Sequence, residues 1–247
     1  MTDRIWILGA PDPEMTAIEA LLTECGERVA YALDDRGERV HAGSAYRGVS
    51  HYYATDCGES GRCEAWYMVE CAVPVPDAAQ GVMIDHHRPG DPGYGRPPAE
   101  FLAASSIGQV ISELARLDRL PASWPWTGAP EGHDKERGLI THWHDQHGVF
   151  TSTVVTVAYN ETGDGSYGCD GGQQAIIPRD LVLTSAADHC LGAAYRGECP
   201  GVDPDALMRW RVETRAKHQG RRAEDVLADV EQVLACDCPN PSIHEDV

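Results

Sequence analysis

One carboxylate, two imidazoles and a guanidinium follow one another in the segment Asp85-His86-His87-Arg88. An apolar run over residues 82–84 precedes the segment, and a Pro/Gly-rich stretch over residues 89–93 follows it. This pattern is typical of a buried strand that ends in a loop. Carboxylates and imidazoles bind divalent metals, and a guanidinium can pair with phosphate. We therefore expect a metal or phosphate site at the carboxyl end of a strand, the edge where open α/β sheets bind ligands.

The elements around this segment predict an α/β fold with a mainly parallel sheet flanked by helices. Residues 4–9 and 29–33 have the composition of buried strands, and residues 15–24 between them have helical spacing of apolar residues. This order implies parallel strands joined by a right-handed crossover. We expect a further strand around residues 66–69 and one long amphipathic helix over residues 99–117.

The second half of the chain changes character. Residues 151–159 are β-branched and predict a strand, so we assign residues 125–175 to a β-rich insertion. The insertion separates an α/β part over residues 1–124 from residues 176–247, which return to the core and add two helices at 204–219 and 223–234. One compact domain overall is expected from this length.

Acidic residues from three other places are expected to converge on the first segment. Glu14 opens the first helix, Glu70 closes the strand at 66–69, and Asp188 follows an apolar run that we interpret as a strand. Together with His86 they form a set of oxygen and imidazole ligands that suits Mn²⁺ or Mg²⁺, with Zn²⁺ as the alternative. Such an ion can polarise a phosphoryl oxygen and lower the pKa of water.

The run Ile84-Asp85-His86-His87 resembles the motif of the DHH phosphoesterase superfamily. The opening turn of that family, Gly-His-x-x-Pro-Asp-x-Asp-Ala, is similar to residues 9–17, with Glu14 in the place of the first Asp. Glu70 and Asp188 take the places of two further acidic motifs. The resemblance covers residues 4–117 and 176–200, and it implies a metal-dependent enzyme that hydrolyses a phosphate ester or anhydride.

The resemblance also implies roles for individual residues. His86 would bind the metal, and His87 would face the phosphate as a hydrogen-bond donor or acid. Asp85 would orient an imidazole from behind. Arg88 or Arg96 would pair with a phosphate oxygen. We expect the substrate to be contacted by Arg96 and by His189, the imidazole beside Asp188.

Two departures from the family pattern leave an alternative open. Ala10 stands where the family has its first His, and Thr16 stands where it has the second Asp of that motif. A one-metal site is easier to build from the remaining residues, and Asp12 could replace one missing ligand. The C-terminal substrate-binding domain of the family is not recognisable. The alternative is a catalytically silent DHH-like domain that binds a nucleotide or a protein partner.

A second histidine cluster competes with the first. His142, His144 and His147 have a spacing that can hold zinc. The run resembles the His-x-His-x-Asp-His motif of metallo-β-lactamase-like hydrolases, but Asp145 sits one position early. A zinc hydrolase centred on these residues is a further alternative, although a polar β-hairpin is the interpretation that we favour.

Bulk composition limits the partners. The 247 residues carry a net charge of −19, which argues against long nucleic acid and anionic membrane surfaces. A small phosphorylated substrate or nucleotide fits this charge better, and a homo-oligomer is compatible with it. No stretch approaches the roughly 20 apolar residues of a membrane helix, and nothing resembles a signal peptide, so we expect a cytoplasmic protein. The nine cysteines include no CxxC pair and are expected to be reduced thiols.

Overall fold

The structure is a computed structural model that describes residues 4–46, 51–54, 65–74, 80–124, 126–127, 135–144, 150–159 and 173–235. The chain divides into two compact units, Met1–Asp203 and Pro204–Val247. The sequence analysis instead placed both C-terminal helices in one domain with the rest. The first unit contains two sheets, and the second contains helices α6 and α7.

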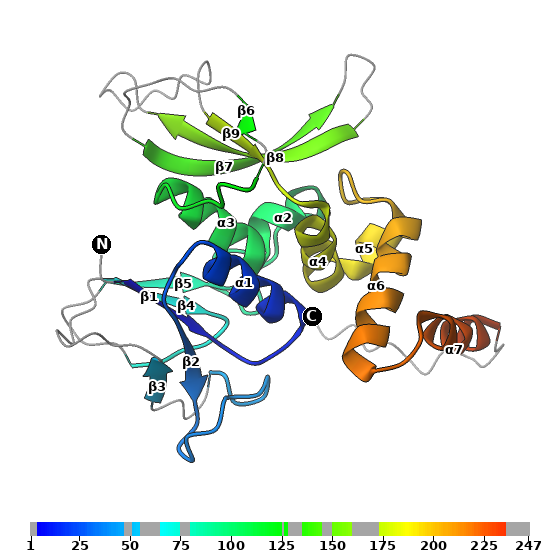
Figure 1. Cartoon of the computed structure of the whole chain (residues 1–247), viewed down its shortest axis with the longest axis horizontal. Helices are drawn as coiled ribbons and strands as arrows, with labels where there is room; N and C mark the ends of the chain where they lie inside the picture. The colour runs from blue at the N-terminus through cyan, green and yellow to red at the C-terminus, as the bar shows by residue number, and fades with distance from the viewer. Residues whose placement is uncertain are drawn as a thin grey trace. The chain divides into compact units, whose positions relative to one another are not determined.

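The first sheet has the order β3-β2-β1-β4-β5 (Figure 1). Its four parallel strands are β1 (Arg4–Leu8), β2 (Val29–Leu33), β4 (Ala65–Val69) and β5 (Gln80–Ile84). The fifth strand, β3 (His51–Ala54), pairs with β2 in the antiparallel direction. The α/β class and the parallel sheet expected from the sequence are therefore confirmed.

The central strand β1 is buried, and its residues Ile5 and Ile7 pack with apolar residues of neighbouring strands and connecting segments. Ile5, Trp6, Ile7 and Leu8 are all fully buried, as in strands of parallel sheets that are covered on both faces. Helix α1 (Pro13–Glu24) buries Met15, Ile18 and Leu22, and it contacts helices α3 and α4.

The helix expected over residues 99–117 is interrupted. The structure has a 3₁₀ turn η1 (Pro98–Glu100), then α2 (Phe101–Ala104) and α3 (Ser106–Arg116). Ser105 between them is extended (ψ 157°), and its hydroxyl accepts a hydrogen bond from the Gly108 amide at 3.1 Å. A Cβ atom on Gly108 would lie 1.5 Å from the Leu102 carbonyl oxygen, so only glycine permits this tight break. The prediction of one continuous helix is wrong because a serine cap starts a new helix inside the apolar pattern.

The second sheet is antiparallel, with the order β6-β9-β8-β7. Its strands are β6 (Trp126–Thr127), β7 (Lys135–His144), β8 (Phe150–Tyr159) and β9 (Gln173–Ile176). They lie in and at the end of the segment that the sequence assigns to a β-rich insertion. Helix α3 contacts β5 of the first sheet and β7 and β8 of the second (Figure 1).

Asp188 does not follow a strand. It lies in the last turn of helix α4 (Arg179–His189), which the short helix α5 (Leu191–Tyr195) follows. The expected strand before Asp188 is therefore wrong. A short apolar run does not by itself distinguish a buried strand from a buried helix, and here contacts with α1 and α2 accompany the helical form.

The second unit is a helical pair. Helix α6 (Pro204–Gln219) and helix α7 (Ala223–Ala235) are joined at Gly220, which adopts the left-handed conformation (φ 62°). Val212, Ala216 and Val226 form its buried apolar cluster. Arg221 pairs with Asp229 at 2.7 Å, and Arg222 pairs with Asp225 at 2.8 Å.

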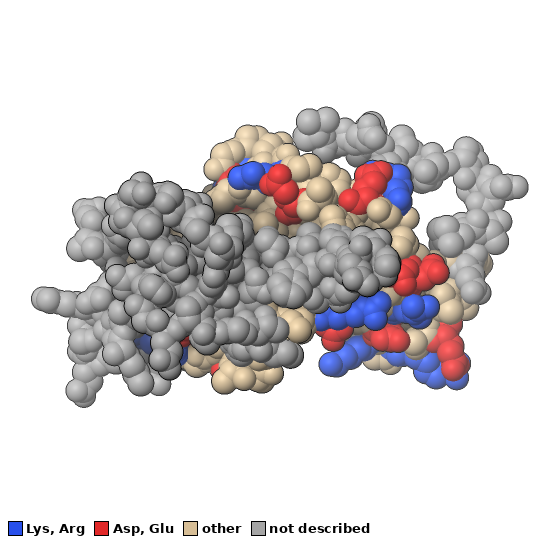
Figure 2. Space-filling view, turned by 90° about the horizontal axis from the view of Figure 1, so that it is seen from above, with Lys and Arg blue, Asp and Glu red and all other residues tan. Residues whose placement is uncertain are grey.

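The charged surface is mixed in sign. In the view of Figure 2, the described Lys and Arg side chains alternate with Asp and Glu and form no broad basic patch. Among the described helices, none combines the length and apolar character that crossing a bilayer requires.

Candidate metal centre

Three strands end level with one another and bring the candidate ligands together. Leu8 of β1 pairs with Val69 of β4, and Val69 pairs with Ile84 of β5. The residues that follow each strand, Gly9, Glu70 and Asp85, therefore leave the sheet at the same edge. Parallel register thus places the segment Asp85-His86-His87 beside Glu70, although 14 residues separate Val69 from Ile84 along the chain.

His86 is the centre of the cluster. Its Nε2 atom lies 3.0 Å from Asp188 Oδ2, 3.5 Å from Glu14 Oε2 and 3.6 Å from Glu70 Oε1. His86, Glu14 and Glu70 are buried, while Asp188 is partly open to solvent. One imidazole nitrogen thus faces three carboxylates that come from α1, the end of β4 and α4.

The buried atoms of this cluster lack ordinary hydrogen-bond partners. Glu14 Oε2, Glu70 Oε1 and His86 Nε2 are all buried and form no hydrogen bond within the described residues. An unsatisfied buried polar atom costs about 1–3 kcal/mol, so a cation shared by these atoms would stabilise the cluster. A metal ion is one partner that carboxylate oxygens and an imidazole nitrogen can share.

A second grouping extends the same site. Glu70, His86, His87 and Asp188 each offer one ligand atom, and these four atoms all lie within 4.8 Å of one another. They could therefore hold a metal ion. Glu14 adds its Oε2 atom on the buried side, next to the same His86 nitrogen. The structure thus brings together all four expected ligands, and it adds His87, to which the sequence analysis gave a role on the phosphate.

The charges of the cluster are mutually dependent. Burial would lower the pKa of His86, but the nearby carboxylates of Asp188, Glu14 and Glu70 favour its charged form and raise the pKa to about 12. Burial raises the pKa of Glu14 well above its usual value. A protonated His86 and a metal ion are therefore alternative cations for the same carboxylates, and metal binding must release that proton.

Asp85 shapes the loop that carries both histidines. Its buried carboxylate accepts hydrogen bonds from the His86 amide at 2.7 Å, the His87 amide at 3.1 Å and the Tyr46 hydroxyl at 2.6 Å. It also contacts His87 Nδ1 at 3.1 Å. Burial alone would raise the pKa of Asp85, but hydrogen bonds from His87 and Tyr46 and from the backbone lower it to about 2. Asp85 thus orients His87 from behind and leaves its Nε2 atom for the cluster.

Glu70 is held in a strained conformation. Its φ of 50° lies in the left-handed region, which non-glycine residues rarely adopt. Gly9 packs against it so closely that a Cβ atom on Gly9 would lie 2.3 Å from the Glu70 carbonyl oxygen. Such strain persists where surrounding structure imposes it, and it is concentrated at functional sites.

Two helix ends hold Glu14. It lies in the first turn of α1, where the Asp12 carboxylate caps the helix by accepting a hydrogen bond from the Met15 amide at 2.7 Å. Glu14 Oε1 accepts a hydrogen bond from the Ile107 amide at 2.9 Å, at the start of α3. Both helix N-termini favour a negative charge at this place. The interruption at Ser105 therefore helps to position Glu14 in the cluster, because it creates the second of these N-termini.

His189, which we expected to contact the substrate, lies against His86. The Nδ1 atoms of the two rings are 3.0 Å apart, and their planes are inclined by 56°. Burial, together with the positive charge of His86, lowers the pKa of His189 to about 4. His189 is thus a neutral imidazole placed behind the ligand His86.

The two arginines expected to bind phosphate differ in position. Arg88 lies over the Tyr46 ring at 3.5 Å and pairs with Asp91 at 3.3 Å and Asp85 at 3.7 Å, so it borders the site. Arg96 is exposed and pairs with Glu100 at 3.1 Å.

Tyr46 and Gln109 are site residues that the sequence analysis missed, because neither lies in a recognisable motif. The Gln109 amide donates to the Asp85 carbonyl at 3.0 Å and accepts from the Asp85 amide at 3.3 Å.

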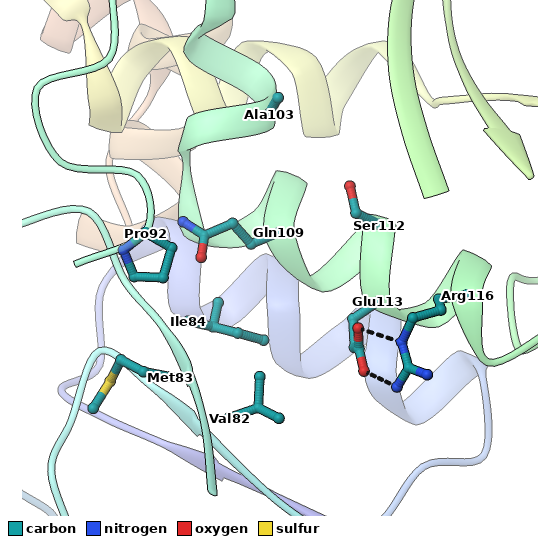
Figure 3. A pocket seen from close by; sticks show the side chains of 9 residues that line it. All are labelled: Val82, Met83, Ile84, Pro92, Ala103, Gln109, Ser112, Glu113 and Arg116. Carbon is teal, nitrogen blue, oxygen red and sulfur yellow. Dashed lines mark hydrogen bonds and ion pairs between the residues drawn. The ribbon is translucent and has the colours of Figure 1, made fainter. Parts of the chain in front are cut away.

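A cavity of about 240 Å³ lies between β5 and α3 (Figure 3). Val82, Ile84, Gln109 and Ser112 are among its lining residues, and Glu113 pairs with Arg116 at its end. None of the four grouped ligands lines it. The cavity therefore adjoins the site through Ile84, which precedes Asp85, and through Gln109, which supports Asp85.

The second histidine cluster receives no structural test. His142 and His144 lie in strand β7, but their side chains and the whole of His147 lie outside the described residues.

The chain matches no protein-family model, and neither a curated protein nor a solved structure is detectably similar to it. The functional argument therefore depends on the geometry of the His86 cluster and on the motif around it.

Proposed function

We propose that the protein is a metal-dependent hydrolase that cleaves a phosphate ester or anhydride in a nucleotide or another small phosphorylated substrate. The observation that carries this proposal is the convergence of three unsatisfied buried atoms, Glu14 Oε2, Glu70 Oε1 and His86 Nε2, on one point beside Asp188. The similarity of residues 84–87 to the DHH motif supports the same chemistry.

The ligand set favours a hard cation. Glu14, Glu70 and Asp188 offer carboxylate oxygens, and His86 offers a single imidazole, which suits Mn²⁺ or Mg²⁺. When bound, such an ion supplies Lewis-acid polarisation of a phosphoryl oxygen and lowers the pKa of water. The Thr16 hydroxyl donates a hydrogen bond to the Asp12 carbonyl oxygen, and the Ala10 side chain has no ligand atom. The remaining ligands therefore favour one metal ion over two.

The protein's own groups then have defined tasks. A neutral His86 that binds through Nε2 carries its proton on Nδ1. This N–H group donates a hydrogen bond to His189 Nδ1. Asp85 holds His87 at Nδ1 and raises its pKa, and in its protonated form His87 can donate a hydrogen bond from Nε2 to a phosphate oxygen. The Arg88 side chain is 39% exposed and can pair with a second phosphate oxygen.

The test is the substitution His86→Ala, with metal content and hydrolysis of a panel of phosphate esters and anhydrides as readouts. Wild type is expected to retain Mn²⁺ or Mg²⁺ and hydrolyse at least one compound, and His86→Ala is expected to lose both. His41→Ala, which removes an exposed imidazole from a turn, is the matched control. Wild-type hydrolysis by a metal-free His86→Ala protein would contradict the mechanism.

The absence of ligands at Ala10 and Thr16 supports one alternative, a catalytically silent domain that binds a nucleotide or a protein partner. The same experiment separates the two proposals. Binding of a nucleotide without turnover of any compound in the panel would favour the silent domain, whereas metal-dependent turnover would exclude it.

A further inference from the structure

Two cysteines lie in contact directly after the helix that carries Asp188 and His189. Cys190 Sγ is 2.7 Å from Cys199 Sγ. Sulfur atoms in a disulfide are about 2.05 Å apart, so the two thiols need only a small side-chain movement to bond. Both residues belong to the first unit and to the described part of the chain.

The local backbone builds this proximity. Helix α4 ends at Cys190 (φ −148°, ψ 41°), and α5 begins at the next residue. Gly197 then reverses the chain in the left-handed conformation (φ 74°), while the Glu198 amide donates to the Ala193 carbonyl at 3.0 Å. This capped turn returns Cys199 to Cys190 without any contribution from distant segments. The geometry of this ten-residue segment therefore brings the two thiols together.

The two thiols differ in access. Cys190 is partly exposed, whereas Cys199 is 2% exposed. A solvent-borne oxidant therefore reaches Cys190 first, and the adjacent Cys199 is placed to resolve the product. An exposed thiol with a neighbouring resolving cysteine is the arrangement found in reversible thiol oxidation.

We propose that Cys190 and Cys199 are a redox-modification site that closes to an intramolecular disulfide under oxidising conditions. With glutathione disulfide as the oxidant, the Cys190 thiolate attacks one of its sulfurs, forms a mixed disulfide and expels one glutathione thiolate. The Cys199 thiolate then attacks the Cys190 sulfur and expels the second. The protein loses two electrons and two protons, and glutathione disulfide becomes two glutathione molecules.

The closed form has a consequence for the metal centre, and this second step rests on the proposed function. Cys190 is two residues from Asp188 and adjacent to His189, so the new bond ties the end of α4 to the residue that follows the turn. The disulfide should make local unfolding of the segment that carries Asp188 and His189 less frequent. The oxidised protein should release bound metal to a chelator more slowly than the reduced protein.

The test of the disulfide needs neither metal nor substrate. The full chain is treated with glutathione disulfide, alkylated to block free thiols and digested with trypsin, which cleaves after Arg196 between the two cysteines. The expected result is that mass spectrometry finds the peptides of residues 180–196 and 197–209 joined without reduction. Cys25→Ser, which removes a half-buried thiol at the end of α1, should leave this linkage unchanged.

The outcomes are separable. Alkylation of both thiols, a stable glutathione adduct on Cys190 or a linkage to any other cysteine would overturn the proposed site. With the linkage present, a several-fold slower release of Mn²⁺ in wild type but not in Cys199→Ser supports the coupling to Asp188. An unchanged release rate would refute that coupling alone.

Discussion

The hydrogen bond between His86 and His189 gives the sharpest prediction about the metal centre. His86 can bind a cation through Nε2 only when Nε2 carries no proton, which requires the proton to be on Nδ1. His189 Nδ1, at 3.0 Å, is the acceptor that stabilises this tautomer. The substitution His189→Ala removes the acceptor and leaves a partly buried N–H donor without its partner.

The expected loss follows from two independent magnitudes. Loss of a hydrogen-bond partner behind a metal-ligating histidine typically lowers metal affinity about 10- to 100-fold. That range corresponds to about 1.4–2.7 kcal/mol, which agrees with the roughly 1–3 kcal/mol cost of an unsatisfied buried donor. We therefore expect His189→Ala to bind Mn²⁺ about 10- to 100-fold more weakly than wild type.

A conservative substitution separates this role from packing. In His189→Asn, the side-chain oxygen occupies nearly the position of Nδ1 and can accept the same hydrogen bond, so most of the affinity should return. Mn²⁺ affinity is measured by competition with a chelator, and circular dichroism checks that each variant is folded. Wild-type affinity in His189→Ala, or equal losses in the Ala and Asn variants, would refute the reasoning.

Three further predictions test the supports of the site and of the sheet. Gly9→Ala should lower the free energy of unfolding by about 1–3 kcal/mol in urea denaturation, because its Cβ would lie 2.3 Å from the Glu70 carbonyl oxygen. Gly192→Ala, whose Cβ meets only Arg196 at an ordinary 3.5 Å, is its neutral control. Glu70→Asn should stabilise the metal-free protein by about 1 kcal/mol by relieving strain at φ 50°, and weaken Mn²⁺ binding; a thermal melt and chelator competition measure the two effects. Glu27→Gln should cost about 3 kcal/mol at pH 7, because this carboxylate accepts hydrogen bonds from Arg4, Trp6 and Arg119. Burial would raise the pKa of Glu27, but these partners lower it below 4.5, so its contribution is present above pH 4.5 and is lost as the pH falls. Urea denaturation at pH 7 and pH 3 should therefore show the gap between wild type and Glu27→Gln narrowing at the lower pH.

Local sequence patterns predicted the four parallel strands and several helices, but not strand β3. The strand at residues 29–33 and the helix at residues 204–219 have the expected bounds. Residue composition and flanking Gly and Pro residues determine such bounds locally. The α/β class follows from the same patterns. The interruption at Ser105 was not predicted, since its apolar spacing continues through the break and only the close approach at Gly108 decides it.

The candidate site was likewise predicted only in part from the sequence. Glu14, Glu70 and His86 were recognisable because each follows a predicted strand or opens a predicted helix, and Asp188 was recognisable as an acid after an apolar run. That run is a helix, however, and the role expected for His189 on the substrate differs from its contact with His86. Neither point could be read from neighbours in the chain.

The sequence by itself determined which polar groups stand at the ends of β4 and β5 and at the start of α1, because apolar runs and chain breaks are local properties of these segments. Only the tertiary structure decided which atoms meet. The hydrogen bond that holds Glu14 joins residues 93 positions apart, and the contact between His86 and His189 spans 103 positions. Such contacts depend on how helices pack over a shared sheet edge, and they bring these polar side chains close enough to hold a metal ion.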